Sequence, residues 1–185
     1  LAVAFKYRGV LGFDLAGAEK DYPAKEHQRA FYRILNNNIN STVHAGEAFG
    51  PDSIGQALRY CGAHRIGHGT RLIENADLLN YVNNHRIPLE ICLTSNIQTG
   101  AAASFETHPL RFYYQLGLRV TLNTDNRLMS NTDLSTEYAR AMQYCDIDLP
   151  SLANIIVNGF KSAFIDYHAR KKLISRAISE LDKIL

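Results

Sequence analysis

Short apolar runs alternate with amphipathic segments along the first two thirds of the chain. The apolar runs are rich in Val, Ile and Leu, and residues 9–15, 41–44, 65–68, 88–93 and 118–122 each predict a β-strand. Helical periodicity covers the intervening residues 24–35, 51–61, 75–84 and 108–115. Because nearly apolar strands alternate with helices, the pattern predicts a parallel sheet that is buried on both faces.

The pattern changes after Asp125. Residues 132–146, 150–164 and 167–185 predict three consecutive helices, with no strand between them. No linker, low-complexity segment or charge block divides the chain. We therefore expect a single α/β domain over residues 1–185, with about five β-α units followed by helices.

Polar residues at or just after the strand ends distinguish between two parallel folds. They are Asp14 with Gly17, His44 with Glu47, His68, Ser95 with Asn96, and Asp125 with Asn126. A (β/α)8 barrel gathers catalytic residues from several strands at this rim, whereas a doubly wound sheet binds ligands at one switch point. No GxGxxG follows the first strand, so the pattern favours a partial (β/α)8 (TIM) barrel.

Composition and charge narrow the function. The chain has 185 residues, 46% of them hydrophobic, and 20 basic against 18 acidic residues give a net charge of +2. This balance argues against a nucleic-acid partner, and no apolar run is long enough for a membrane span. Lys6 and Arg8 interrupt the stretch that a signal peptide would need, so we expect a cytoplasmic protein. The three cysteines form no CxxC pair and are expected to be buried free thiols.

Three strand ends carry residues that suit hydrolytic chemistry. His44 is followed three positions later by Glu47, and the small residues Ala45 and Gly46 between them would hold the turn open for a substrate. Glycines flank His68 and would clear space around its imidazole, and Asp125 follows the last strand. Taken singly, these features are equally typical of a core histidine, a helix-capping glutamate, a structural turn and an Asx cap. Together they fit a catalytic zinc site, in which His44 and Asp125 are ligands. His68 would then orient or deprotonate the water, and Glu47 would donate a proton to the substrate.

Five motifs occur in a family-specific order. They are Phe13-Asp14-Leu15-Ala16-Gly17, Val43-His44-Ala45-Gly46-Glu47, Arg65-Ile66-Gly67-His68-Gly69-Thr70, Leu93-Thr94-Ser95-Asn96 with Thr99-Gly100, and Leu122-Asn123-Thr124-Asp125-Asn126. This series resembles the signature motifs of the adenosine deaminase family, which are (β/α)8 metal-dependent amidohydrolases. The resemblance extends from the first predicted strand to Asp125 and includes the helical tail.

The resemblance implies an activity and a role for each matching residue. The expected reaction is the zinc-dependent hydrolytic deamination of adenosine and 2'-deoxyadenosine, which yields inosine from adenosine, releases ammonia and serves purine salvage. His44 and Asp125 would bind Zn²⁺, Glu47 would protonate purine N1, and His68 would handle the proton of the water that attacks C6. Gly17 would offer its backbone N–H to purine N3, and Asp14 is assigned no catalytic role.

One position departs from the form of the family that has two consecutive aspartates. Asn126 follows Asp125, where those enzymes have a second aspartate facing purine N7. A carboxyl group must hold a proton to donate to N7, whereas an asparagine amide donates without one. We therefore expect Asn126 to make the N7 contact.

The family also has a His-x-His pair, which supplies two further zinc ligands, and this chain has none. The five predicted strands would be the last five of the eight in a barrel. The remaining histidines, among them His27, His64 and His108, fit surface or capping positions. We therefore expect the C-terminal portion of a longer enzyme, which needs the missing N-terminal part of the barrel and is inactive alone.

The sequence leaves three other functions open. Deamination of adenine or another 6-substituted purine uses the same chemistry, because ribose contacts would come from the missing part. A non-catalytic barrel would not need Glu47 and His68. A phosphate-binding lyase or isomerase would need a glycine-rich loop longer than Thr99-Gly100-Ala101.

Overall fold

The computed structural model describes residues 1–185. Its strands are β1 (Gly12–Leu15), β2 (Asn40–Ala45), β3 (Arg65–His68), β4 (Leu89–Ile91) and β5 (Val120–Leu122). Its α-helices are α1 (Gln28–Leu35), α2 (Pro51–Arg59), α3 (Ala76–Asn84), α4 (Leu93–Gln98), α5 (Leu110–Gln115), α6 (Arg127–Ser130), α7 (Leu134–Tyr144), α8 (Leu149–Ser162) and α9 (Tyr167–Leu181). Three short 3-10 helices are η1 (Val3–Phe5), η2 (Ala24–His27) and η3 (Thr70–Glu74). All five predicted strands and all seven predicted helical segments are present.

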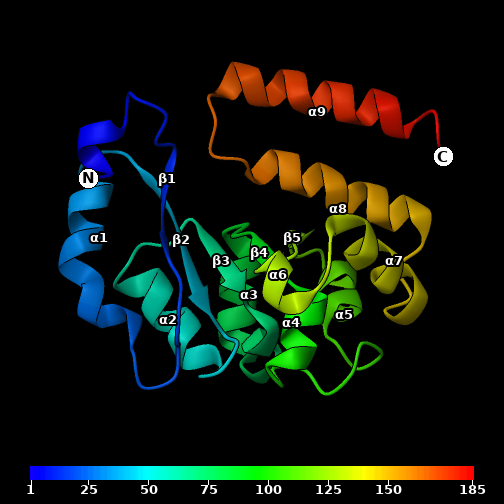
Figure 1. Ribbon diagram of the computed structural model, residues 1–185, viewed down its shortest axis with the longest axis horizontal. Coiled ribbons are helices and arrows are strands. Elements are labelled where there is room, and N and C mark those ends of the chain that lie inside the picture. The colour runs from blue at the N-terminus through cyan, green and yellow to red at the C-terminus, as the bar shows by residue number, and fades with distance from the viewer.

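The sheet is parallel throughout, and its spatial order is the sequence order β1-β2-β3-β4-β5 (Figure 1). A doubly wound sheet would reverse its strand order at a switch point, and this sheet does not. Neighbouring strands pair so that His44 lies opposite Gly67, and Ala45 lies opposite His68. The predicted partial barrel is confirmed, and the C-terminal ends of its strands lie along one rim.

Side-chain caps fix the starts of four predicted helices, and Asn126 caps α6 in the same way. Each cap accepts a hydrogen bond from a backbone N–H three residues later: Asn75 from Leu78, Asp133 from Thr136, Asp148 from Ser151, and Asp166 from Ala169. Such caps satisfy N–H groups that have no partner within the helix. These starts lie within two residues of those that the sequence predicts.

The fourth predicted strand is too long. The expected strand over residues 88–93 ends at Ile91, and Leu93 begins α4, a helix that the sequence pattern did not reveal. A short apolar run does not separate a strand from a buried helical turn. A distant residue stabilises the turn, because the buried carboxylate of Glu137 on α7 accepts a hydrogen bond of 3.1 Å from the backbone N–H of Thr94. Ser95 and Asn96 therefore lie on a helix rather than at a strand end.

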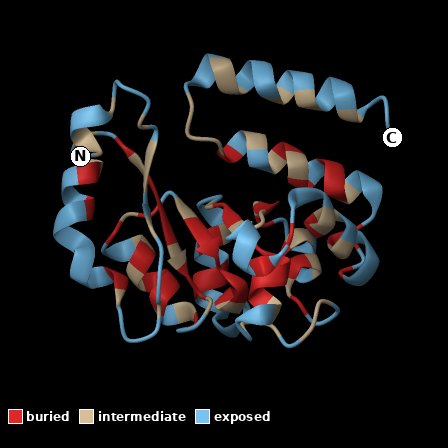
Figure 2. Ribbon diagram, in the orientation of Figure 1, coloured by how far each residue is buried: buried red, intermediate tan, exposed pale blue.

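The core lies between the sheet and the helices that cover it. A single cluster of 26 buried residues includes Val43, Ile66, Leu89 and Val120 from four strands, so the strands share one contiguous core. Figure 2 shows buried positions on the strands and α8, whereas α9 has none and packs against α8. All three cysteines are buried free thiols, as expected. None of the helices is long and apolar enough to cross a bilayer.

Candidate active site

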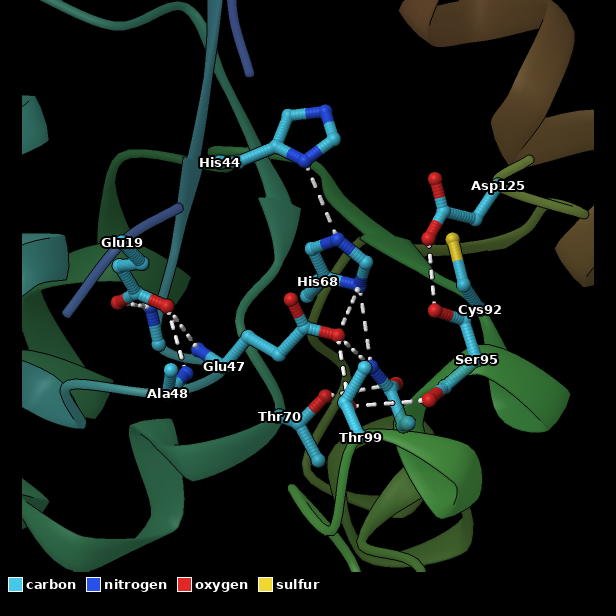
Figure 3. Close-up of polar contacts among 12 residues, drawn as sticks. Glu19, His44, Glu47, Ala48, His68, Thr70, Cys92, Ser95, Thr99 and Asp125 are labelled. Carbon is cyan, nitrogen blue, oxygen red and sulfur yellow. Dashed lines mark hydrogen bonds and ion pairs between the residues drawn. The ribbon is translucent and has the colours of Figure 1, made fainter. Parts of the chain in front are cut away.

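Two imidazoles from neighbouring strands meet at the C-terminal rim. Nδ1 of His44 on β2 lies 3.2 Å from Nε2 of His68, the last residue of β3 (Figure 3). A Cβ atom on Gly67 would lie only 2.8 Å from Cδ2 of His44, so the glycine is needed for the His44 ring to cross β3. The sequence attributed the flanking glycines to space around His68, but Gly67 makes room for His44.

Glu47 lies beside the other ring nitrogen of His68. Its Oε1 atom lies 3.6 Å from Nδ1 of His68 and accepts a hydrogen bond of 2.9 Å from the hydroxyl of Thr99. His68 is 1% exposed, and this burial lowers its pKa, although the nearby Glu47 carboxylate opposes the shift. The pair therefore combines a carboxylate with an imidazole whose neutral form is favoured by burial.

Asn96 fixes the orientation of this pair. Its Oδ1 accepts from the hydroxyl of Thr70 (2.7 Å) and from Nε2 of His108 (3.2 Å). His108 must present its proton at Nε2, because its Nδ1 accepts from the backbone N–H of Leu110. The Asn96 amide nitrogen consequently faces Nδ1 of His68 at 3.0 Å and Oε1 of Glu47 at 3.5 Å.

This hydrogen-bond direction determines the tautomer of His68. Because Nδ1 of His68 accepts from Asn96, the proton of the neutral ring is on Nε2, on the side of His44. His108 supports the arrangement from a buried position, where desolvation lowers its pKa to about 3. The sequence analysis gave His108 a surface or capping position. The residue lies two positions before α5 but is only 4% exposed, and its contact with Asn96 was not expected.

Glu19 holds the turn that carries Glu47. Its carboxylate accepts hydrogen bonds from the backbone N–H groups of Gly46 (2.8 Å), Glu47 (2.9 Å) and Ala48 (2.6 Å), and from the hydroxyl of Ser53 (Figure 3). Glu19 follows β1, so it joins the β1 loop to the turn after β2. No sequence spacing reveals this role, because three of the four donors are backbone groups that any residue provides.

Gly46 serves packing rather than substrate access. Its φ is +73°, and a Cβ atom there would collide with the side chain of Ile54 on α2. The sequence analysis attributed Ala45 and Gly46 to an open approach for substrate. That interpretation is wrong for both residues, because Ala45 is fully buried.

Asp125 lies at the same rim. Its Oδ2 accepts a hydrogen bond of 2.6 Å from the hydroxyl of Ser95 on α4. In the view of Figure 3, Asp125 and His44 both lie above His68. Asp125 has a φ of +56° and His68 has a φ of +64°, so two of the predicted site residues occupy the sparsely populated left-handed region.

The other two predicted site residues border this cluster without joining it. Gly17 and His44 line a pocket of about 260 Å³. A Cβ atom on Gly17 would meet nothing within 4 Å, but its φ of +121° requires glycine. Asn126 caps α6, because its Oδ1 accepts from the backbone N–H of Met129 (3.2 Å). Its amide nitrogen makes no hydrogen bond within the chain.

The donor atoms of this rim suit zinc but are too few to hold it. His44 and Asp125 offer an imidazole nitrogen and a carboxylate oxygen, and no group of three His, Cys, Asp or Glu residues converges closely enough for a metal ion. Asp14 adds a carboxylate oxygen at 3.8 Å from Nε2 of His44. A catalytic zinc uses three protein ligands. The residues present therefore supply two of the ligands that such a metal site needs.

The parallel strand order and the rim of converging polar residues define the class: part of a (β/α)8 barrel with its candidate site at the C-terminal ends of the strands. A family model described as adenosine deaminase matches residues 1–180. The chain therefore belongs to the adenosine deaminase family.

Curated relatives support this membership. An adenosine deaminase from Mycobacterium sp. (strain KMS) is 43% identical over 189 residues, which cover 96% of this chain and 52% of the relative. An adenosine deaminase from Mycobacterium tuberculosis (strain ATCC 25618 / H37Rv) has the same identity and coverage. The chain thus spans about half the length of the curated relatives that it matches.

Solved structures show the same architecture. An N6-methyl-AMP deaminase from Arabidopsis thaliana, in its apo form, is 28% identical and superposes with a TM-score of 0.86, covering 96% of this chain and 52% of that one. An adenine deaminase from Arthrobacter aurescens is 22% identical, with a TM-score of 0.89 over 98% of this chain and 57% of that one. At that identity the second likeness concerns the fold alone.

Proposed function

We propose that this chain forms the C-terminal part of an enzyme that deaminates adenosine and 2'-deoxyadenosine hydrolytically, and so serves purine salvage. The observation that carries the proposal is the Glu47-His68 pair, with 3.6 Å between Oε1 and Nδ1, beside His44 at the rim. The identity of 43% to relatives named adenosine deaminase supports adenosine as the substrate.

Glu47 is the proposed proton donor to purine N1. Its Oε1 is oriented by the Thr99 hydroxyl and the Asn96 amide, so the carboxyl group is held in one place. Protonation of N1 makes C6 more electrophilic, and C6 is the atom that water attacks. The 18% exposure of the Glu47 side chain leaves it accessible to a substrate.

His68 is the proposed group that orients the attacking water. Asn96 donates to its Nδ1, so the proton of the neutral ring is on Nε2, on the side of His44. Burial favours this neutral ring, whose Nε2–H would donate a hydrogen bond to the oxygen of the attacking water.

Zn²⁺ is the proposed cofactor, with His44 and Asp125 as two of its ligands. When bound, the metal lowers the pKa of a water molecule and so makes a nucleophile available at neutral pH. Ser95 orients the Asp125 carboxylate through its hydrogen bond of 2.6 Å, a type of support that metal ligands commonly have. The remaining ligands would come from the part of the barrel that precedes β1.

Gly17 and Asn126 are the proposed purine contacts. The backbone N–H of Gly17 would meet N3, at a loop that borders the pocket shared with His44. The amide nitrogen of Asn126 would donate to N7, since the cap to Met129 uses only its oxygen. An asparagine does both without a change of protonation.

The test compares substrates in the complete barrel, which is this chain joined to the strands that would precede β1. We expect turnover of adenosine and 2'-deoxyadenosine, its loss on chelation of zinc, and its recovery when zinc is restored. Adenine and N6-methyl-AMP are the comparison substrates, because solved relatives of this fold are named as deaminases of these compounds. A strong preference for either would overturn adenosine as the substrate.

The isolated 185-residue chain is proposed to be inactive, as a catalytically incomplete fragment. It offers fewer zinc ligands than a catalytic site uses, and β1 and β5 each have one unpaired edge. Measurable zinc-dependent deamination by this chain alone would contradict this proposal.

A further inference from the structure

A second concentration of charge lies at the opposite ends of the strands. A surface hollow of about 390 Å³ is lined by the residues that begin or precede four strands, namely Asn40, Arg65, Pro88 and Arg119. The loop after α3, the end of α8 and the first turns of α9 complete the lining. We call this feature the N-terminal hollow. Its volume falls in the range of small-molecule pockets.

The lining of the N-terminal hollow is strongly cationic. It contains five side chains that are always charged at neutral pH, and no Asp or Glu: Arg65, Arg86, Arg119, Lys161 and Arg170. These five are a quarter of the 20 basic residues of the chain, whose net charge is only +2. The charge is therefore a local concentration rather than a share of an evenly basic surface.

Most of this charge has no carboxylate partner. Arg65 pairs with Glu90 at 3.0 Å, but none of the other four forms an ion pair. Arg86 and Arg170 each donate to a backbone carbonyl, of Gly117 and Ala163 respectively, which leaves their charge uncompensated.

Arg119 is the least satisfied member. Its Nε atom is buried and has no hydrogen-bond partner. Burial and the neighbouring charges of Arg86 and Arg170 lower its pKa. Burial of a donor without an acceptor is unfavourable, so an acceptor that reached it would be favoured.

We propose that the N-terminal hollow binds a phosphate group, either as free phosphate or on a small phosphorylated molecule, through Arg119 and Lys161 with Arg86 and Arg170 around them. A phosphate offers several acceptor oxygens and close to two negative charges, which match guanidinium donors and an ammonium group. The site lies at the opposite strand ends from His44 and His68, so it is separate from the proposed deaminase site.

The experiment titrates phosphate into the complete barrel by calorimetry at constant ionic strength, with chloride replacing phosphate in the control. The variants are Arg119→Gln and Lys161→Gln, of which the second changes an exposed residue and should not affect folding. The matched control is Arg59→Gln, an exposed arginine on α2 outside the hollow. We expect each of the first two to weaken phosphate binding about tenfold or more, because each removes a charge-assisted contact, and the control to leave it unchanged.

A second titration with ribose 5-phosphate identifies the source of the phosphate. Tighter binding than inorganic phosphate would mean a phosphorylated metabolite, and equal or weaker binding would mean free phosphate. Binding that chloride reproduces, or that Arg59→Gln weakens equally, would overturn the proposal. Phosphate binding to the 185-residue chain but not to the complete barrel would also overturn it, since the hollow would then not be a site of the complete enzyme.

Discussion

The two ends of the parallel strands differ in charge and in how well their polar groups are satisfied. At the C-terminal rim, Glu19 and Glu47 accept seven hydrogen bonds or ion-pair contacts among them, from backbone, hydroxyl, amide and imidazole groups. At the N-terminal hollow, Arg119 has a buried donor without an acceptor, and Lys161 forms no ion pair. The carboxylates of Glu19 and Glu47 are satisfied by groups of the chain itself, whereas the buried donor of Arg119 is not.

This difference follows from parallel pairing. All strands run the same way, so residues that follow strands gather at one end and residues that precede strands gather at the other. The net charge of +2 is a sum over the whole chain, so it does not reveal the local charge of either region. The following four changes test the contrast, beginning with the largest expected effect.

Substitution of Glu47 by Gln in the complete barrel should lower kcat by about 10²–10⁴-fold, because general acid catalysis contributes that much. Zinc content and phosphate binding at the N-terminal hollow should stay unchanged. The measurement is steady-state deamination of adenosine alongside metal analysis, with Glu180→Gln on α9 as the matched control. Undiminished kcat would exclude Glu47 as the proton donor.

Substitution of Glu19 by Gln tests whether the hydrogen bonds that hold the 46–48 turn support catalysis. A glutamine has one acceptor oxygen, and its amide group would face N–H donors of the 46–48 turn. We expect kcat to fall about 10- to 100-fold with a smaller change in KM, since about 1–3 kcal/mol of support for the Glu47 turn is lost. Recovery in Glu19→Asp would favour positioning by charge, whereas an unchanged kcat in Glu19→Gln would show that the turn holds itself.

Acid should weaken folding through His108. Its pKa is about 3 in the folded protein against 6.5 for an ordinary histidine, so the unfolded chain binds more protons between these values. Stability therefore decreases as the pH falls from 6.5 towards 3, by up to about 1.4 kcal/mol per pH unit from this group. Urea denaturation across this range should show a shallower decrease in His108→Gln than in the wild type. The exposed His168→Gln is the control, and an equal slope in all three proteins would contradict the assignment.

Substitution of Arg119 by Met should have the smallest effect, and it should raise the stability of the fold rather than lower it. It removes one of several unpaired like charges and the buried Nε donor while keeping a long side chain. We expect a gain of about 0.5 kcal/mol in the free energy of unfolding at low salt, which high salt should reduce by screening. Thermal denaturation at two salt concentrations measures this effect. A loss of stability at low salt would mean that Arg119 has a favourable partner.

Much of the architecture could be read from the sequence because it depends on local patterns. The strands at Arg65–His68 and Asn40–Ala45 follow from apolar runs, and helix starts such as that at Asn75 follow from capping residues. Helix α4 could not be predicted in this way, because the apolar run 88–93 is compatible both with a strand and with a buried helical turn. The contact from Glu137, 43 residues away, became visible only in the folded chain.

The candidate site likewise combines features that the sequence reveals with contacts that only the folded chain shows. The sequence by itself determined the parallel barrel architecture, the family and the residues His44, Glu47, His68 and Asp125 at strand ends, because residue type and order along the chain carry that information. Only the tertiary structure decided that Asn96 sets the His68 tautomer, that Glu19 holds the Glu47 turn and that five cations share one hollow. These arrangements use backbone donors and residues far apart in sequence, and their distances exist only once the strands are paired.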